Sequence, residues 1–339
     1  MTDITTNRRA FLRSIAGAGT VLLAGCSSSG STTLRMGAGP QGSATFASTQ
    51  ALQKVVNENA ENVEISAQET SGTGPSNFRL YDNGEIDAGG FDNFAAAEAM
   101  NDSGSFEENS VDKIPYQGFF YVLAHMYVVA RAETDIQTTD DLAGANVWLN
   151  PPGTSVRPPT DAVFQEAGLY DQINLFEMGR SDLPGALEEE RVDAAVVYGV
   201  NYKTLPGWVS ELDARFELRA VTATEAFRQA IENADGTTFE EVDTYGWNQD
   251  IGADSAATWN LGAQFRFGDG VSTEAAKTIT RIAYEQNDAI IEANAIYPEY
   301  SEVSDMTSGL IADQPVHPGV AEFWQEEGAW NDSWTTGEL

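Results

Sequence analysis

A glycine-rich loop near the start of the chain has the spacing of a site for an anionic ligand. Residues 34–46 read LRMGAGPQGSATF and place Gly37, Gly39 and Gly42 in a G-x-G-x-x-G pattern. This pattern is typical of a dinucleotide-binding turn, where the N-terminus of a helix meets the pyrophosphate and an acidic residue for the ribose follows roughly 20 positions on. Acidic residues stand at that distance, but Pro40 interrupts the fingerprint. We therefore favour a loop that lines one wall of a ligand cleft over a site for NAD.

Two further loops repeat this chemistry later in the chain. Residues 71–77 read SGTGPSN and residues 150–159 read NPPGTSVRPP, and each leads into a helical pattern. The N-terminus of a helix presents unpaired backbone N–H groups and the positive end of the helix dipole, so it binds a carboxylate or phosphate without a basic side chain. Arg157 adds a guanidinium fork for a planar carboxylate. A plain turn with an N-cap is the alternative for either loop taken alone.

The expected cleft combines loop hydroxyls, backbone groups, aromatic side chains and the polar end of a strand. The expected ligand-contacting residues are Gly39, Gly42, Ser43, Phe46, Gly72, Thr73, Asn77, Phe91, Asp92, Asn93, Gly153, Thr154, Ser155, Arg157, Tyr198 and Trp259. Core packing is the alternative for the aromatic residues, and a turn is the alternative for Asp92 and Asn93. Arg79 is a second basic candidate, for which a surface salt bridge is the simpler interpretation. No cofactor and no metal are expected.

Residues for catalysis are sparse. The chain has two histidines, His125 in an apolar run and His317 in an HPG turn. The sequence contains no H-E-x-x-H, no G-x-S-x-G and no His/Cys cluster. Carboxylates are so frequent that a nearby pair says little about glycosidase chemistry. We expect a protein that is not an enzyme, and a secreted hydrolase is the alternative.

Residues 1–26 have the order of an export signal. Arg8 and Arg9 precede an uncharged stretch rich in Ala and Gly, which ends in LAGC at Cys26. The arginine pair resembles a twin-arginine signal, and LAGC resembles a lipobox, in which the cysteine takes lipid. The stretch is too short and too poor in Leu and Ile for a transmembrane helix. We expect residues 27–33 to form a flexible tether and the exported protein to be anchored to the outer face of the cytoplasmic membrane through Cys26; a buried helix with a structural cysteine is the alternative.

The composition is strongly acidic. The formal net charge is -34, from 52 acidic and 18 basic residues, while 42% of the residues are hydrophobic. That hydrophobic fraction is enough for a packed core, which argues against disorder. A halophilic surface explains the acidity, because carboxylates keep the surface hydrated where concentrated salt screens their repulsion. Nothing in the composition would neutralise a phosphate backbone, so nucleic acid is excluded as a partner.

Strand-like and helical patterns alternate along the chain, which predicts an α/β class. The longest apolar run, at 117–131, is expected to cross between two lobes, and residues 217–223 are expected to cross back. EIDA at 85–88 and RVDA at 191–194 end similar strand-loop-helix units, which suggests two similar halves. The expected boundaries are 34–129 plus 220–339 for lobe 1, including helices near 224–233 and 272–294, and 130–219 for lobe 2.

These motifs together resemble those of the TAXI-type solute receptors of tripartite (TRAP) transporters, here as a lipoprotein of haloarchaeal type. The first loop is similar to G-x-G-x-x-G-[ST]-x-[YF], with Ser43 and Phe46 near its end. Residues 71–87 are similar to the family's [ST]-x-G-[GS]-S-x-x-N-x-x-L loop and the G-x-[IV/A]-D strand after it. The loop at 150–159 looks like G-x-x-G-[ST]-G-[ST], and a V-H-P-G-[AV] motif stands at 316–320.

The resemblance implies a periplasmic-binding-protein-like fold of type II, with two α/β lobes joined by crossing strands and a ligand cleft between them. It also implies a receptor that captures a small carboxylate or amino acid, such as glutamate or a related dicarboxylate, for the integral membrane permease subunits of a TRAP transporter. We expect a monomer. The sequence departs from the family pattern where Phe46 replaces a Tyr, where Val156 replaces a Gly, and at Pro75. A two-lobed sensor would use the same cleft, so import and sensing both stay open.

Overall fold

A computed structural model describes residues 31–234, 237–311 and 313–339. Residues 31–339 form one compact unit. The predicted export signal, the lipobox with Cys26 and most of the predicted tether lie outside the described residues. The first strand begins at Thr32, so the last two residues of the expected tether belong to this strand instead.

The strands form a single mixed sheet in the order β2-β1-β3-β10-β4-β7-β5-β6, with β8 paired to β4 and β9 paired to β10. The strands are β1 (Thr32–Gly37), β2 (Val63–Gln68), β3 (Ala88–Asp92), β4 (Tyr116–Arg131), β5 (Asn146–Trp148), β6 (Asn174–Leu175), β7 (Ala194–Val200), β8 (Leu218–Ala220), β9 (Phe239–Asp243) and β10 (Ser255–Phe267).

Helices connect the strands and cover the sheet. The α-helices are α1 (Ala44–Asn59), α2 (Pro75–Asp82), α3 (Asn93–Met100), α4 (Arg157–Glu166), α5 (Leu183–Glu188), α6 (Gly207–Arg215), α7 (Glu225–Asn233), α8 (Thr273–Glu285), α9 (Asn287–Ala293) and α10 (Pro318–Glu326). Short 3-10 helices are η1 (Gly104–Phe106), η2 (Thr139–Leu142), η3 (Arg180–Asp182) and η4 (Val303–Thr307).

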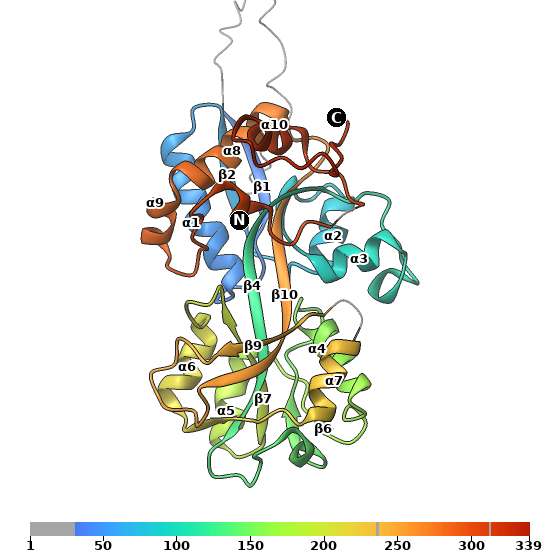
Figure 1. Cartoon of the computed structure of the whole chain (residues 1–339), viewed down its shortest axis with the longest axis vertical. Coiled ribbons are helices and arrows are strands. Elements are labelled where there is room, and N and C mark those ends of the chain that lie inside the picture. The colour runs from blue at the N-terminus through green and yellow to red at the C-terminus, as the bar shows by residue number, and fades with distance from the viewer. Residues whose placement is uncertain (1–30, 235–236, 312) are drawn as a thin grey trace, which may run out of the picture. The chain divides into compact units, whose positions relative to one another are not determined.

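Two long antiparallel strands, β4 and β10, run through both lobes (Figure 1). In lobe 1, β3 pairs with β10 and continues the parallel strands β1 and β2; in lobe 2, β7 pairs with β4 and continues β5 and β6. Almost every residue of β4 is buried. This explains the unbroken apolar run, because a strand covered on both faces needs apolar side chains on both. The prediction that this segment crosses between lobes is confirmed.

The predicted return crossing is wrong. The strand within 217–223, β8, pairs only with the far end of β4, and β10 is the strand that returns to lobe 1. Helix α7 belongs to lobe 2 as well, since Phe227 packs edge-on against Phe164 of α4 with ring centroids 5.6 Å apart. Lobe 2 therefore continues beyond the expected boundary at 219, through α7 and β9.

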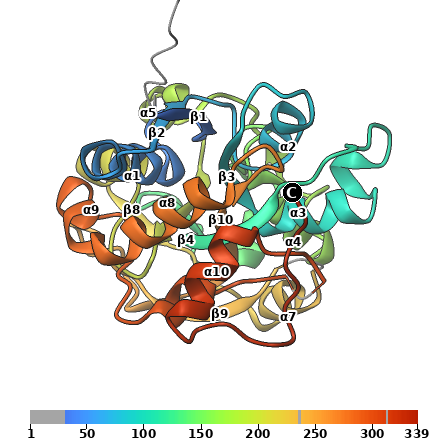
Figure 2. The ribbon, with the colours of Figure 1, turned by 90° about the horizontal axis from the view of Figure 1, so that it is seen from above.

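Two hydrophobic clusters flank the sheet in lobe 1. Leu52, Val55 and Val56 on one face of α1 belong to the large core cluster with residues of α8. Helices α2 and α3 form a separate cluster with Phe91 of β3. The view from above shows α1, α8 and α9 together, apart from α2 and α3 (Figure 2). Such a sheet covered by helices on both faces matches the predicted α/β class.

The two lobes share a detail at the aspartate of the repeated I/V-D-A sequence. Asp87 accepts a hydrogen bond from the backbone N–H of Arg35 in β1 at 2.8 Å. Asp193 accepts one from the backbone N–H of Asn146 in β5 at 2.9 Å. In each lobe the aspartate stands just before the third parallel strand and ties it to the first. The predicted similarity of the halves is therefore real in the structure.

Within the described ranges, no helix has both the length and the apolar character needed to span a bilayer.

Candidate ligand-binding cleft

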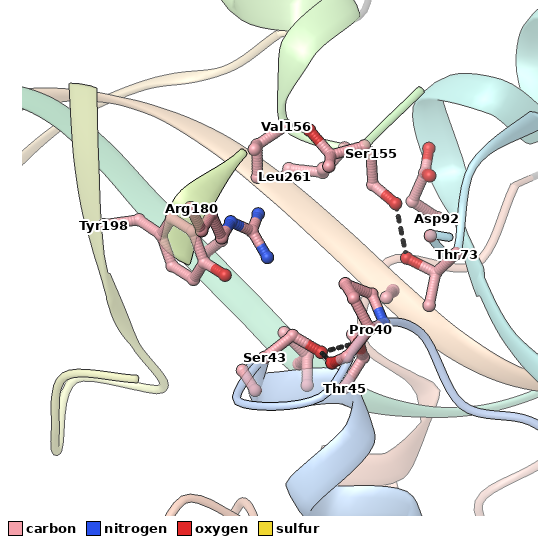
Figure 3. Close-up of a pocket in the computed structure, with 16 residues that line it drawn as sticks. Pro40, Ser43, Thr45, Thr73, Asp92, Ser155, Val156, Arg180, Tyr198 and Leu261 are labelled. Atoms are coloured by element: carbon pink, nitrogen blue, oxygen red, sulfur yellow. Dashed lines mark hydrogen bonds between the residues drawn. The ribbon is translucent and has the colours of Figure 1, made fainter. Parts of the chain in front are cut away.

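A cavity lies where the two lobes face each other across β4 and β10. Its walls come from the three glycine-rich loops, from residues near the ends of β3 and β7, and from η3 (Figure 3). Of the expected ligand-contacting residues, those that line it are Ser43, Gly72, Thr73, Asp92, Thr154, Ser155 and Tyr198. The structure thus brings loops from both halves of the chain to one cavity.

The first loop presents the N-terminus of α1 to the cavity. Ser43 is the N-cap residue, and its hydroxyl accepts a hydrogen bond from the backbone N–H of Phe46 at 3.2 Å. Ala44 and Thr45, at the first positions of the helix, line the cavity. Since the first N–H groups of a helix lack partners within the helix, this wall offers donors and a positive dipole end to an anion.

The other two loops touch each other across the lobes. The hydroxyls of Thr73 and Ser155 form a hydrogen bond of 2.7 Å. Gly72 lies so close to the facing loop that a Cβ there would be 3.0 Å from the carbonyl oxygen of Gly153. A Cβ at Gly72 would therefore require the facing backbone to shift by a few tenths of an ångström, and the loop pair forms a direct contact between the lobes.

Arg180 is the cation of the cleft, and the sequence analysis missed it. Its side chain points into the cavity (Figure 3), and its guanidinium lies 5.3 Å from the ring centroid of Trp208 and 6.0 Å from that of Tyr198. Its Nη2 donates to Asn150 Oδ1 at 3.3 Å. Among the described residues it has no carboxylate partner within 4.0 Å, unlike Arg157. No motif surrounds Arg180, so only its place in the fold identifies it.

Asp92 is buried at the opposite side of the cavity. Its Oδ1 caps α3 by accepting the backbone N–H of Ala95 at 2.7 Å, while Oδ2 has no hydrogen-bond partner in the described structure. Burial raises the pKa of the carboxyl from 3.8 to about 7, although the hydrogen bond from Ala95 and the nearby Ser155 hydroxyl act in the other direction. Near neutral pH this carboxyl is therefore close to half protonated.

The crossing strands form an apolar floor. The side chains that do so are Val122 and Ala124 of β4 and Leu261 and Ala263 of β10. Further apolar contributions come from Pro40, Ala44 and Val156. Pockets of this kind, with an apolar lining and a few polar groups, are typical of sites for small organic molecules.

Arg157 does not line the cavity, although it follows the second-lobe loop. It is 5% exposed; its Nε donates to Asp161 Oδ1 at 2.6 Å, and its Nη1 donates to the Asn150 carbonyl at 3.0 Å. Arg79 is also placed elsewhere, where its guanidinium donates to the carbonyls of Ser105 and Asn109. The expected carboxylate contact of Arg157 is therefore not supported, because local partners turn its side chain into lobe 2.

Several other expected contacts serve the fold near the cavity. Asn77 is buried, and its Nδ2 donates to the carbonyl of Gly90 at 2.8 Å. Phe91 and Trp259 are fully buried in the core. The side chain of Asn93 bonds the Gly309 carbonyl at 2.6 Å. The remaining expected residues that do not line the cavity are Gly39, Gly42, Phe46 and Gly153.

Both histidines are packed. His125 Nδ1 lies 2.6 Å from the hydroxyl of Tyr245, and burial lowers the pKa of His125 to about 4. His317 caps α10, and burial lowers its pKa to about 4 as well. Neither lines the cavity. Among the residues that the structure describes, no group of three His, Cys, Asp or Glu side chains is placed to hold a metal ion.

The chain is similar to several solved structures of solute-binding proteins. The alkanesulfonate-binding protein of Xanthomonas axonopodis pv. citri has 15% identity and a TM-score of 0.43, with 90% of this chain and 96% of that chain covered. A TctC solute-binding protein from Polaromonas has 12% identity and a TM-score of 0.46, with 79% and 98% covered. A TRAP periplasmic solute-binding protein from a Sulfitobacter species, with bound β-D-galacturonate, has 11% identity and a TM-score of 0.43, with 77% and 81% covered. No curated protein matches the sequence.

The architecture confirms the expected fold class, since two α/β lobes are joined by the crossing strands β4 and β10 with a cavity between them. A sequence profile of the NMT1-like family matches residues 36–328, which include every cavity-lining residue. The chain belongs to the NMT1-like family.

Proposed function

We propose that this protein is an extracytoplasmic solute-binding protein that captures a small organic acid or amino acid between its lobes. The observation that carries the proposal is Arg180, a cation without a carboxylate partner in the described residues, which faces the interlobe cavity. The ligand's carboxylate binds the Arg180 guanidinium, and the N-terminus of α1 contributes donors from the opposite lobe. An arginine fork matches the geometry of a carboxylate.

The net negative charge of the protein opposes the binding of an anionic ligand. With a net charge of -34, the long-range field repels an anion. Selection must therefore occur at short range, where Arg180 and the helix end act, and concentrated salt helps because it screens the repulsion. This explains how an acidic surface and an anion site coexist in one chain.

Binding is coupled to closure in this proposal. The loops that carry Thr73 and Ser155 belong to different lobes and already form a hydrogen bond of 2.7 Å. Opening breaks this contact and admits the ligand, and reclosure surrounds it. In this proposal the residues that line the cavity bind the ligand, and we propose no catalytic step for them.

We further propose that the protein acts outside the cell as a monomer, attached through a lipid on Cys26, and delivers its ligand to TRAP-type permease subunits. The twin-arginine-like signal and the lipobox support the export and the anchor. If Cys26→Ala remains in the membrane fraction, the lipid anchor is refuted. If deletion of the gene leaves uptake of the bound solute unchanged, the transport role is refuted.

Ligand binding is tested by thermal shift in molar KCl against a panel of carboxylates and amino acids. A ligand at 100 times its Kd stabilises a protein by about 2.7 kcal/mol. We expect Arg180→Gln to abolish the response. Arg79→Gln removes one arginine outside the cavity and should keep the response, so it controls for the change in net charge. A full response in Arg180→Gln would refute the site.

A further inference from the structure

We propose that the cleft selects organic acids that carry a single negative group on an apolar body and discriminates against dicarboxylates. This inference rests on the proposed function and narrows its ligand class. It concerns three walls of one cavity: the side with Arg180, the floor from the crossing strands, and the side with Asp92.

The first observation concerns the number of positively charged side chains that a ligand can reach in the cavity. Of the described residues that line the cavity, Arg180 is the one with a positive charge. Nearby cations are engaged elsewhere: Arg157 pairs with Asp161 at 2.6 Å, and Arg266 is fully buried and donates to Asn93 Oδ1 at 3.1 Å. One guanidinium binds one carboxylate in fork geometry, so a second carboxylate on the ligand finds no cation.

The second step is the floor. Val122 and Ala124 of β4 and Leu261 and Ala263 of β10 present aliphatic surface to the middle of the ligand. Polar groups set along the ligand's body would lose hydration there without gaining a partner, whereas an aliphatic or aromatic body gains from burial. The floor therefore matches an apolar body.

The third step is the side opposite Arg180. Asp92 and Arg180 lie across the cavity from each other (Figure 3). The Oδ2 atom of Asp92 and the hydroxyl of Tyr121 are both buried without a hydrogen-bond partner in the described structure. Moving a ligand carboxylate out of water costs free energy. An ionised Asp92 increases that cost because the two negative charges repel each other. A ligand that ends in a second carboxylate would face this acidic group, while one that ends in a hydrocarbon would not.

The test compares acids with similar carbon skeletons that carry one or two carboxylates. Isothermal titration calorimetry of the protein in molar KCl measures pentanoate against glutarate, and benzoate against phthalate. We expect at least one monoacid to bind about tenfold tighter than its diacid, which corresponds to about 1.4 kcal/mol. Equal or tighter binding of the diacid in both pairs would overturn the inference while leaving the proposed function intact. If no organic acid of any class binds, the proposed function itself fails.

The variant Asp92→Asn tests the contribution of Asp92 to this selectivity separately from the effect of the protein's net charge. The amide keeps the cap on α3, because its oxygen can still accept the Ala95 N–H. We expect the variant to bind diacids more tightly, so that the difference in affinity between the diacid and the monoacid narrows. Asp171→Asn, which removes an exposed carboxylate, should leave the difference unchanged. If the difference in affinity between monoacid and diacid is as large in Asp92→Asn as in the parent protein, the proposed role of Asp92 is refuted.

Discussion

The buried carboxyl of Asp92 makes folding stability depend on pH, and Asp92→Asn removes that dependence. The carboxyl is 1% exposed and its Oδ2 has no hydrogen-bond partner in the described structure. Desolvation raises its pKa from 3.8 to about 7. The charged groups around it, Glu98 and Arg266, act on this pKa in opposite directions and less strongly than burial.

The sign follows from the two protonation equilibria. Well below pH 3.8 the carboxyl is protonated in both the folded and the unfolded state, and it causes no loss of stability. As the pH rises from 3.8 toward about 7, the unfolded chain ionises while the folded protein holds its proton, so stability falls. Because a tenfold change in a proton equilibrium corresponds to about 1.36 kcal/mol, the rise of this pKa from 3.8 to about 7 lowers the free energy of unfolding by about 4 kcal/mol above pH 7.

We therefore expect Asp92→Asn to increase the free energy of unfolding by up to about 4 kcal/mol at pH 8 and to change it little at pH 4. Reversible urea unfolding between pH 4 and 8 at constant ionic strength measures the effect. Asp171→Asn, which removes the same charge from an exposed site, controls for the overall net charge and should show no such trend. The reasoning is refuted if the two variants show parallel pH profiles.

Three further variants probe the walls of the cleft. Thr73→Val removes the hydrogen bond to Ser155 between the lobes, worth about 1 kcal/mol, and X-ray scattering without ligand should then report a larger radius of gyration; an unchanged radius would contradict the contact's role in closure. Ser43→Ala removes the cap of α1 and should lower the free energy of unfolding by about 1 kcal/mol, as chemical denaturation can measure, and an undiminished value would mean that the cap contributes nothing. Gly72→Ala places a Cβ 3.0 Å from the Gly153 carbonyl oxygen, so we expect calorimetry to show weaker binding of any ligand that stabilises the parent protein; full affinity would show that the loops need not approach so closely.

Much of the fold could be predicted because it follows from local patterns. The apolar run that became β4, the helical spacing of α1 and the two I/V-D-A strands were all recognisable in the sequence. The sequence did not show which strand returns between the lobes, because neither β8 nor β10 has a distinctive sequence feature. Their roles differ only in partners, since β8 meets the far end of β4 while β10 pairs with β4 and β3.

The candidate site, like the fold, could be predicted from the sequence only in part. Glycine-rich loops before helices were visible in the sequence, and the structure places residues of all three loops at one cavity. From the sequence, Arg157 was preferred because it follows the loop at 150–159, and Arg180 was missed, because the neighbours of each guanidinium depend on the fold. Asp161 holds the first within lobe 2, while Trp208 and Tyr198 support the second over the cavity.

The sequence by itself determined the alternating elements, the turns that need glycine, the acidic surface and the paired halves, because each depends on residues close together in the chain. Only the tertiary structure decided which arginine faces the cleft, which strand returns between the lobes and how deeply Asp92 is buried. These properties depend on contacts between segments far apart in sequence, as in the pairing of Thr73 with Ser155. A side chain's charge is set by its type, but its availability to a ligand is set by the neighbours that the fold brings to it.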